Sequence, residues 1–292
     1  VLLSVPREKL IQRLTSEATQ LGVEIFRGME VVHVRPATGQ LTVRESDGRI
    51  SEQQCRRILA ADGVFSICRE SVARHADAPS SRWDSGMSFT TVTISAEAAI
   101  SANLDPCWIH FSSERGAMAI ALPNRDGSLS LILEWAERKT SSEVRDLSHA
   151  KSILAKFKND SLVSLASNLP EALLECRIRT FKYVDCDRWS DGCVALLGDA
   201  AHALPPYLGS GVNSALVDAL ACTTAINKEQ DFCTAMTRYE RERKEYANAL
   251  DKLARQHERA LILGEWGRLT WRLGQRINRA AEALLEYRTP YQ

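Results

Sequence analysis

One segment near residue 200 constrains the fold more than any other part of the chain. The run 191–197 is apolar and predicts a buried strand. It leads into Gly198-Asp199, two prolines, Gly209 and Gly211, and a helical pattern then extends to about residue 227. The prolines fix the backbone and the glycines let it pass close to a flat ligand. A helix beginning near Gly211 would direct free N–H groups at an anion or an electron-rich carbonyl.

The same segment has two further interpretations. Asp199, at the end of the strand, could accept hydrogen bonds from ligand hydroxyls, or it could simply cap the following helix. The two glycines could also suggest a dinucleotide-binding fingerprint, but that motif needs a third glycine directly after a strand. Ser214 stands where the third glycine would be. The glycine pair is therefore weak evidence for such a fingerprint.

Composition excludes several classes of function. A length of 292 residues suggests about two domains. Lys+Arg and Asp+Glu are both 37, so the net charge gives no reason to expect nucleic acid as a partner. The eight cysteines contain no CxxC pair and the histidines no HExxH, so no metal site is predicted. Scattered free thiols are typical of a reducing compartment and favour a cytoplasmic location.

Hydrophobic periodicity divides the remainder of the chain. The first part predicts an amphipathic helix over 8–21, a strand over Val23–Phe26, a strand pair over 30–35 and 40–45, a turn at Asp47-Gly48, and a strand over 57–61. The middle predicts an antiparallel sheet with strands over 89–94, 107–111, 117–122 and 129–135, then helix over 146–174 and a strand over 176–184. Helix is predicted from 231 to the end. The expected parts are residues 1–80, 81–184, 185–228 and 229–292.

Three motifs together resemble one family. Gly198-Asp199-Ala200-Ala201-His202, with Pro206, Gly209, Gly211, Asn213 and Asp218, resembles the GD motif of FAD-dependent aromatic hydroxylases, the single-component flavoprotein monooxygenases. Ala60-Ala61-Asp62-Gly63, with Ser66 and Arg69, is similar to their DG motif. Arg7 with Leu10 resembles their R-x-x-L helix start. The hairpin from Ala121 to Ser128 is similar to the substrate domain of kynurenine 3-monooxygenases.

The resemblance implies a fold and a reaction. The fold would be α/β, with a Rossmann-like FAD-binding domain lacking its first βαβ unit, an antiparallel substrate-domain sheet and a helical C-terminal part. NADPH would reduce FAD, and O2 would give a flavin C4a-hydroperoxide that hydroxylates a small, kynurenine-like aromatic substrate. The cofactor carries such chemistry, so no catalytic acid or base is expected from the protein.

Site residues follow from the resemblance by position. Arg7 would contact the phosphate or ribityl region of FAD, and Asp62, Gly63 and Arg69 would hold FAD and help NADPH approach. The remaining cofactor-binding residues would be Gly198, Asp199, Pro206, Gly209, Gly211, Val212 and Asn213. His257 falls at the substrate-recognition position. The alternatives are a turn residue for Asp62 and a surface helix residue for His257.

The chain departs from the family at its start, which lacks the strand–GxGxxG–helix unit. We therefore expect an N-terminally truncated chain that by itself binds FAD poorly. Two alternatives to the hydroxylase remain open. One is a non-catalytic flavoprotein remnant, and the other is a flavin-dependent epoxidase or reductase on the same fold.

The C-terminal tail combines an apolar helical stripe from Ile262 to Leu284 with a row of arginines from Arg268 to Arg279. A helix packed on the flavin domain and a membrane-surface helix both fit this pattern. The tail is too interrupted by charge to span a bilayer. At most peripheral membrane contact is therefore predicted.

Overall fold

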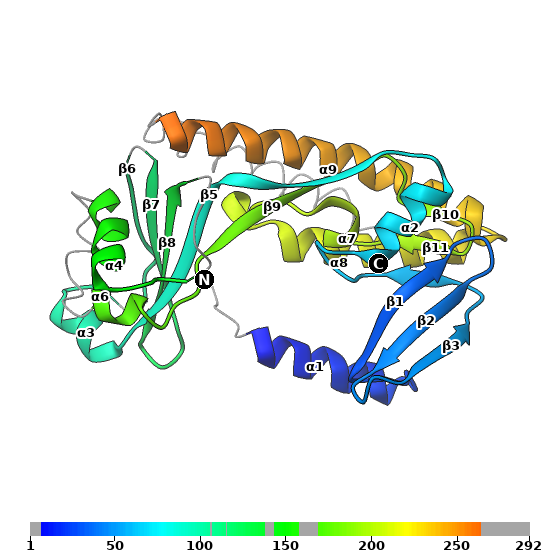
Figure 1. The fold of residues 1–292 in the computed structure, drawn as a ribbon, viewed down its shortest axis with the longest axis horizontal. Coiled ribbons are helices and arrows are strands. Elements are labelled where there is room, and N and C mark those ends of the chain that lie inside the picture. Colours follow the sequence, from blue (N-terminus) through cyan, green and yellow to red (C-terminus); the bar gives the residue numbers. More distant parts are fainter. Residues whose placement is uncertain (1–6, 106, 115, 138–142, 158–168, 264–292) are drawn as a thin grey trace, which may run out of the picture. The chain divides into compact units, whose positions relative to one another are not determined.

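The structure is a computed structural model that describes residues 7–105, 107–114, 116–137, 143–157 and 169–263 (Figure 1). The chain divides into two compact units. The first unit comprises Val1–Ser85 and Phe181–Ala254, and the second comprises Gly86–Thr180 and Arg255–Gln292.

The first unit opens with helix α1 (Arg7–Gln20) and a three-stranded antiparallel sheet of β1 (Met29–Arg35), β2 (Gln40–Glu45) and β3 (Ile50–Gln54). The predicted helix and strand pair are therefore confirmed. Gly39 takes a φ of +74° in the turn between β1 and β2, where its N–H donates to Arg35 O at 2.8 Å.

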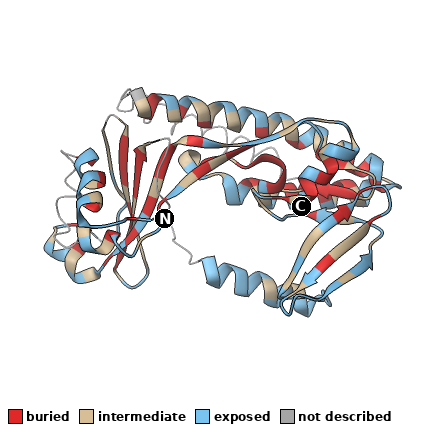
Figure 2. Cartoon of the chain, in the orientation of Figure 1, coloured by how far each residue is buried: buried red, intermediate tan, exposed pale blue. Residues whose placement is uncertain are grey.

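The strand predicted over Val23–Phe26 is wrong. This stretch has no regular structure, and the side chains of Val23 and Phe26 are 52% and 69% exposed. An apolar run becomes a strand when a neighbouring strand completes its backbone hydrogen bonds, and the described residues offer no such neighbour here. Helix α1 likewise buries none of its residues (Figure 2).

A short sheet carries both motif segments of the first unit. It contains β4 (Ile58–Ala60), β10 (Ser190–Asp191) and β11 (Val194–Leu196) in the order β10-β11-β4. Strands β11 and β4 are parallel, with Leu196 opposite Ala60. The single strand predicted over 191–197 is thus a hairpin, because Gly192 turns the chain with a φ of +53°. Parallel pairing brings the carboxyl ends of β4 and β11, and so the residues that follow them, to one edge.

Five helical segments complete the first unit as far as Ala254, where the unit ends within the last of them. They are α2 (Ile67–His75), α7 (Asp199–His202), the 3-10 turn η2 (Pro206–Leu208), α8 (Gly211–Lys228) and α9 (Phe232–Leu263). One face of α8 enters the hydrophobic core through Ala221, Cys222 and Ala225, which have helical spacing. These residues pack with the β11 strand and with Met236 and Tyr239 of α9. The helix predicted from 211 to about 227 is confirmed.

The second unit contains most of a five-stranded sheet in the order β6-β7-β8-β5-β9; β5 begins in the first unit, which ends at Ser85, and β9 continues into it from Phe181. Its strands are β5 (Ser80–Ile94), β6 (His110–Glu114), β7 (Ala117–Pro123), β8 (Leu129–Ala136) and β9 (Arg179–Cys186). The pairs β6–β7, β7–β8 and β5–β8 are antiparallel, as predicted. A short loop joins β7 to β8, and there the Asn124 N–H donates to Ser128 O at 2.8 Å.

Alternation along β8 separates the two faces of this sheet. Leu129, Leu131, Leu133 and Trp135 are fully buried in one hydrophobic cluster with Ala150, Ile153 and Leu173. The last three come from the helices α4 (Leu147–Leu154) and α6 (Leu169–Leu173), so these helices cover that face (Figure 1). Of the helix predicted over 146–174, the described residues form α4, the 3-10 turn η1 (Ala155–Phe157) and α6, and residues 158–168 lie outside the described residues. A short α3 (Ala96–Ser101) also joins this cluster.

The predicted tail stripe and its arginines, from 264 onward, lie outside the described residues. Within residues 7–263, apart from the gaps given above, no helix combines the length and the hydrophobicity required to cross a membrane.

Candidate functional site

The turn after β11 presents the first candidate residues. Gly198 has φ +57° and ψ −136°, a conformation that is unfavourable for other residues. An added Cβ there would lie 3.1 Å from Cβ of Ala215, so the position also lacks room. Asp199 follows as the first residue of α7 and is exposed. The helix has no side-chain cap bond, so the interpretation of Asp199 as a helix cap is wrong.

The start of α8 forms the second part of the site. Gly209 is left-handed with φ +59°, and Ser210 before the helix makes no side-chain cap bond. Gly211, Val212 and Asn213 are exposed, and a Cβ added at Gly209 or Gly211 would meet nothing within 4 Å. Pro206 is exposed as well. The first turn of α8 is therefore exposed and its N–H groups have no side-chain cap, as a helix terminus that takes an electron-rich ligand requires.

The turn after β4 carries the DG residues. Gly63 has φ +76°, and Ser66 caps α2 by accepting the Arg69 N–H at 2.8 Å. Asp62 is exposed and its Oδ2 accepts the N–H of Cys68 at 3.2 Å. Asp62 thus helps to hold the turn before α2, in line with its alternative interpretation as a turn residue. Its contact with the cofactor stays a prediction.

Arg69 joins the two motif segments from inside the protein. Its side chain is 2% exposed, Nη1 donates to Ala200 O at 3.0 Å and Nη2 to Val64 O at 2.9 Å. These bonds link the DG turn to α7. The guanidinium therefore faces backbone carbonyls, and its support of a cofactor would be indirect. Direct contact of Arg69 with FAD remains a prediction.

Arg7 and His257 belong to elements other than those that carry the residues described so far. Arg7 is the exposed first residue of α1. His257 belongs to the second unit, where it is 7% exposed within α9. The interpretation of His257 as a surface residue is therefore wrong. Burial lowers the pKa of His257, which favours its neutral form. A role in substrate recognition stays a prediction.

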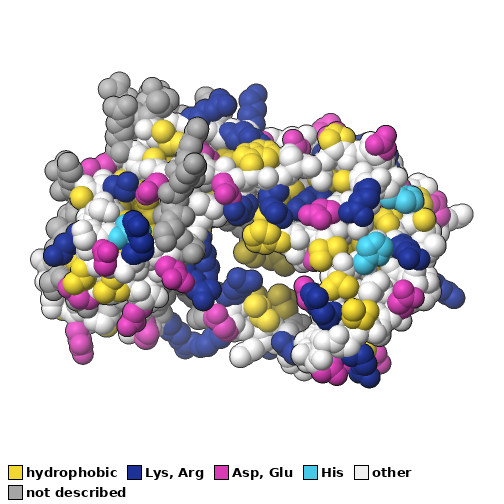
Figure 3. Space-filling view, in the orientation of Figure 1, with side chains coloured by type: hydrophobic (Ala, Val, Ile, Leu, Met, Phe, Trp, Pro, Cys, Tyr) yellow, Lys and Arg dark blue, Asp and Glu magenta, His cyan; other side chains and the backbone are white. Residues whose placement is uncertain are grey.

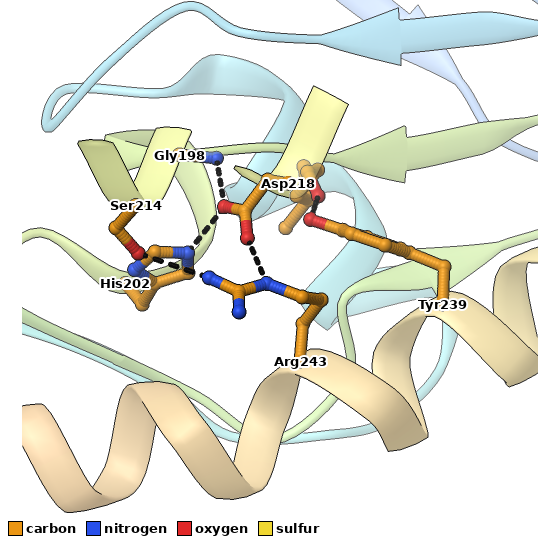
Figure 4. A network of polar contacts seen from close by, with 7 residues as sticks. Gly198, His202, Ser214, Asp218, Tyr239 and Arg243 are labelled. Carbon is orange, nitrogen blue, oxygen red and sulfur yellow. Dashed lines mark hydrogen bonds and ion pairs between the residues drawn. The ribbon is translucent and has the colours of Figure 1, made fainter. Parts of the chain in front are cut away.

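A buried polar network underlies the exposed site (Figure 4). Asp218 of α8 is 0% exposed and accepts hydrogen bonds from Gly198 N at 3.0 Å, His202 Nε2 at 2.6 Å and Arg243 Nε at 2.7 Å. His202 also stacks on Trp189 with ring centroids 4.9 Å apart. Asp218 is one of the motif residues expected from the sequence, whereas no sequence motif includes Arg243. The burial of Asp218 could have been inferred from its helical spacing, since Asp218 lies on the same face of α8 as Ala221, Cys222 and Ala225.

A second buried acid lies in the other unit. Glu134 of β8 is 3% exposed, and its Oε2 has no hydrogen-bond partner among the described residues. Burial raises its pKa to about 8. It stands at an even position of β8, off the alternation that places Leu133 and Trp135 in the core. Glu134 is not among the site residues predicted above, although an acidic residue that interrupts an apolar strand is a signal visible in the sequence.

Neither the surface charge nor the described His, Cys, Asp and Glu side chains indicate a further binding site. On the face drawn in Figure 3, basic and acidic side chains are interspersed, in keeping with a net charge of zero. Among the described residues, no group of three or more His, Cys, Asp and Glu side chains could hold a metal ion.

Comparison with known proteins shows a matching family and several proteins of similar sequence. The model of the family described as FAD binding domain matches residues 2–254. A Rhodococcus erythropolis protein described as "Probable 2-heptyl-3-hydroxy-4(1H)-quinolone synthase AqdB2" is 29% identical over 249 residues, covering 82% of this chain and 59% of that protein. Kynurenine 3-monooxygenase of Flavobacterium johnsoniae is 26% identical over 256 residues, covering 86% and 57%. The chain thus spans little more than half the length of these relatives.

The fold has solved counterparts. Klebsiella pneumoniae HpxO, in a crystal structure with FAD and uric acid, matches with a TM-score of 0.68 at 20% identity, over 94% of this chain and 68% of that one. The expected α/β fold of an FAD-binding domain is therefore confirmed.

Proposed function

Because the chain belongs to the family described as FAD binding domain, we propose that it is part of an FAD-dependent, NADPH-consuming monooxygenase that hydroxylates a small aromatic substrate with O2. The observation that carries the proposal is the uncapped, exposed start of α8 beside the exposed Asp199. FAD, when bound, supplies the exchange of electrons and the activation of O2.

The residues present fit this cofactor. Gly209 and Gly211 leave open space that a side chain would occupy, so a planar ring could approach the backbone there. The N–H groups of Val212 and Asn213 would bind electron-rich atoms at the ring edge. Asp199 would accept hydrogen bonds from the ribityl or ribose hydroxyls. Gly198, Gly63, Asp62 and Pro206 would shape the two turns, and Arg69 would tie them together.

The remaining roles are assigned by position. Arg7 would bind the phosphate or ribityl region, as its motif suggests, and His257 would contact the substrate. The substrate class follows the relatives: a kynurenine-like aromatic, with a 4(1H)-quinolone as the second candidate, because the quinolone synthase is 29% identical to this chain. For the whole protein we propose a cytoplasmic location with at most peripheral membrane contact.

Titration of the chain with FAD, followed by flavin fluorescence, tests the proposal. Weak but saturable binding is expected, and absence of saturation would favour the non-catalytic remnant. NADPH oxidation that kynurenine or a 4(1H)-quinolone stimulates, with formation of a hydroxylated product, would support the monooxygenase. NADPH oxidation in which the substrate gains an epoxide or only hydrogen would instead support the epoxidase or reductase alternative.

A further inference from the structure

Arg243 lies in α9, outside every motif named above, and its side chain is buried in the first unit. The residue is 6% exposed. Its Nε donates to Asp218 Oδ1 at 2.7 Å and its Nη2 to Ser214 Oγ at 3.2 Å, and the guanidinium lies 4.6 Å from the ring centre of Tyr246. A cation that is removed from water in this way needs its partners, and Asp218 is the charged one.

Asp218 carries the connection onward to the turn after β11. Burial opposes ionisation of Asp218, but hydrogen bonds and charge from His202 and Arg243 outweigh it and hold the pKa of that carboxyl below its usual range. The ionised carboxylate can therefore accept the N–H of Gly198 together with its two side-chain donors (Figure 4).

Both exposed parts of the candidate site depend on this one guanidinium. Gly198 directly precedes Asp199, so the bond from its N–H to Asp218 holds the turn that presents the Asp199 carboxylate. Ser214 lies in the first turn of α8, directly after Asn213, and its hydroxyl accepts from the same guanidinium. Arg243 thus contacts the start of α8 directly, through Ser214, and is linked to the start of α7 through Asp218.

We propose that Arg243 is a positioning residue of the candidate site, which holds Asp199 and the first-turn N–H groups of α8 in the arrangement that one ligand requires. The inference rests on the proposed function, since FAD is the ligand expected to span these two segments. Arg243 itself is buried beneath them and acts through Asp218 and Ser214.

The test compares Arg243→Met with Arg241→Met, which removes an exposed arginine two residues away on the same helix. Amide hydrogen exchange of the chain without FAD is measured at residues 197–203 and 210–216. Faster exchange is expected in both segments of Arg243→Met, with exchange of β7 and β8 unchanged. FAD binding, followed by flavin fluorescence, should weaken at least about ten-fold, and the absorption bands of any bound flavin should shift. Arg241→Met should match the parent in every measurement.

Conservative substitutions separate positioning from a general effect on folding. Arg243→Lys keeps the charge but has a single donor nitrogen in place of three, so its FAD affinity should lie between those of Arg243→Met and the parent. If Arg243→Met does not fold, Arg243→Gln takes its place with the same expectations.

Three outcomes would each overturn a proposal, the first two the positioning role and the third the proposed function. A folded Arg243→Met or Arg243→Gln chain with the parent's exchange and FAD affinity would overturn the positioning role. Failure of both to fold, with Arg241→Met folded, would overturn it in favour of a purely structural role. A parent chain that does not bind FAD would overturn the proposed function instead, and the exchange comparison would still decide whether Arg243 holds the turn.

Discussion

Asp199 and Asp218 belong to the same motif, yet their surroundings give them different tasks. Asp199 is exposed at the start of α7, whereas Asp218 is fully buried and accepts three hydrogen bonds from within the protein. A carboxylate that is fully buried and hydrogen-bonded within the protein is out of reach of ligand hydroxyls, whereas an exposed one can accept hydrogen bonds from them. The ligand-facing role is therefore expected of Asp199 alone.

Replacement of Asp199 by alanine should weaken FAD binding without loss of the fold. A hydrogen bond to a charged group contributes roughly 1.5–3 kcal/mol, so the dissociation constant should rise about ten- to a hundred-fold. Fluorescence titration measures it, with Asp187→Ala as the control because Asp187 is another exposed aspartate of the first unit. Equal affinity of Asp199→Ala and the parent would exclude the role.

Glu134 predicts a pH dependence of stability that a single substitution should remove. Its folded-state pKa, about 8, lies above the ordinary value of 4.5, so the folded state favours the neutral acid. The stability this contributes is fully present below the ordinary pKa and is lost as the pH rises through about 8. Between these values the parent should lose up to about 1.4 kcal/mol per pH unit relative to Glu134→Gln.

Urea unfolding of the parent and of Glu134→Gln at about pH 5 and about pH 8 measures this difference. Glu175→Gln, an exposed glutamate of the same unit, serves as the control and should follow the parent. Parallel pH profiles of the parent and Glu134→Gln would show that the carboxyl is not neutral in the folded protein.

At the scale of elements, α8 combines a structural face and a binding end. Its buried face contributes Asp218, Ala221, Cys222 and Ala225 to the interior, while its first turn remains exposed and uncapped. The same helix can therefore be anchored in the core and still offer free N–H groups at its start. This division separates variants that affect binding from variants that affect folding.

Gly211→Val tests the binding end of α8 directly. A Cβ at this position meets nothing within 4 Å in the protein, so the folded state tolerates the side chain. The branched side chain would instead occupy the space in front of the first-turn N–H groups and should abolish FAD binding. The midpoint of thermal unfolding without FAD should stay near that of the parent. Gly211→Ala should weaken binding less, and unchanged flavin occupancy in Gly211→Val would contradict the assignment.

At the scale of the whole molecule, each unit has a hydrophobic cluster of its own. Leu131 of β8 belongs to the cluster of the second unit and Leu196 of β11 to that of the first, and both are fully buried. Each cluster draws its members from one unit only, so the stability of each unit should respond mainly to its own core.

Leu131→Ala and Leu196→Ala test that independence as a matched pair. Truncation of a buried leucine costs roughly 2–5 kcal/mol. Amide hydrogen exchange should therefore accelerate in the strands of the second unit for Leu131→Ala and around β4 and β11 for Leu196→Ala. Equal acceleration in both units by either variant would show that the units unfold together.

The sequence was sufficient to predict the elements whose signals are local. The helices α1 and α8, the β1–β2 pair and the β7–β8 hairpin all follow from periodicity and from turn residues such as Gly39 and Gly127. The exposed site was also predictable, because a strand, two prolines and two glycines before a helix dictate an open turn on steric grounds.

Contacts between distant parts of the chain were decided by the tertiary structure. Arg243 lies 25 residues beyond Asp218, and Arg69 lies 131 residues before Ala200. No local pattern indicates that either arginine turns inward. The apolar stretch Val23–Phe26 shows the converse, since it has strand character and remains irregular. A strand or a buried charge is stable only with its partner, and a local sequence pattern does not specify partners that the fold brings together from far along the chain.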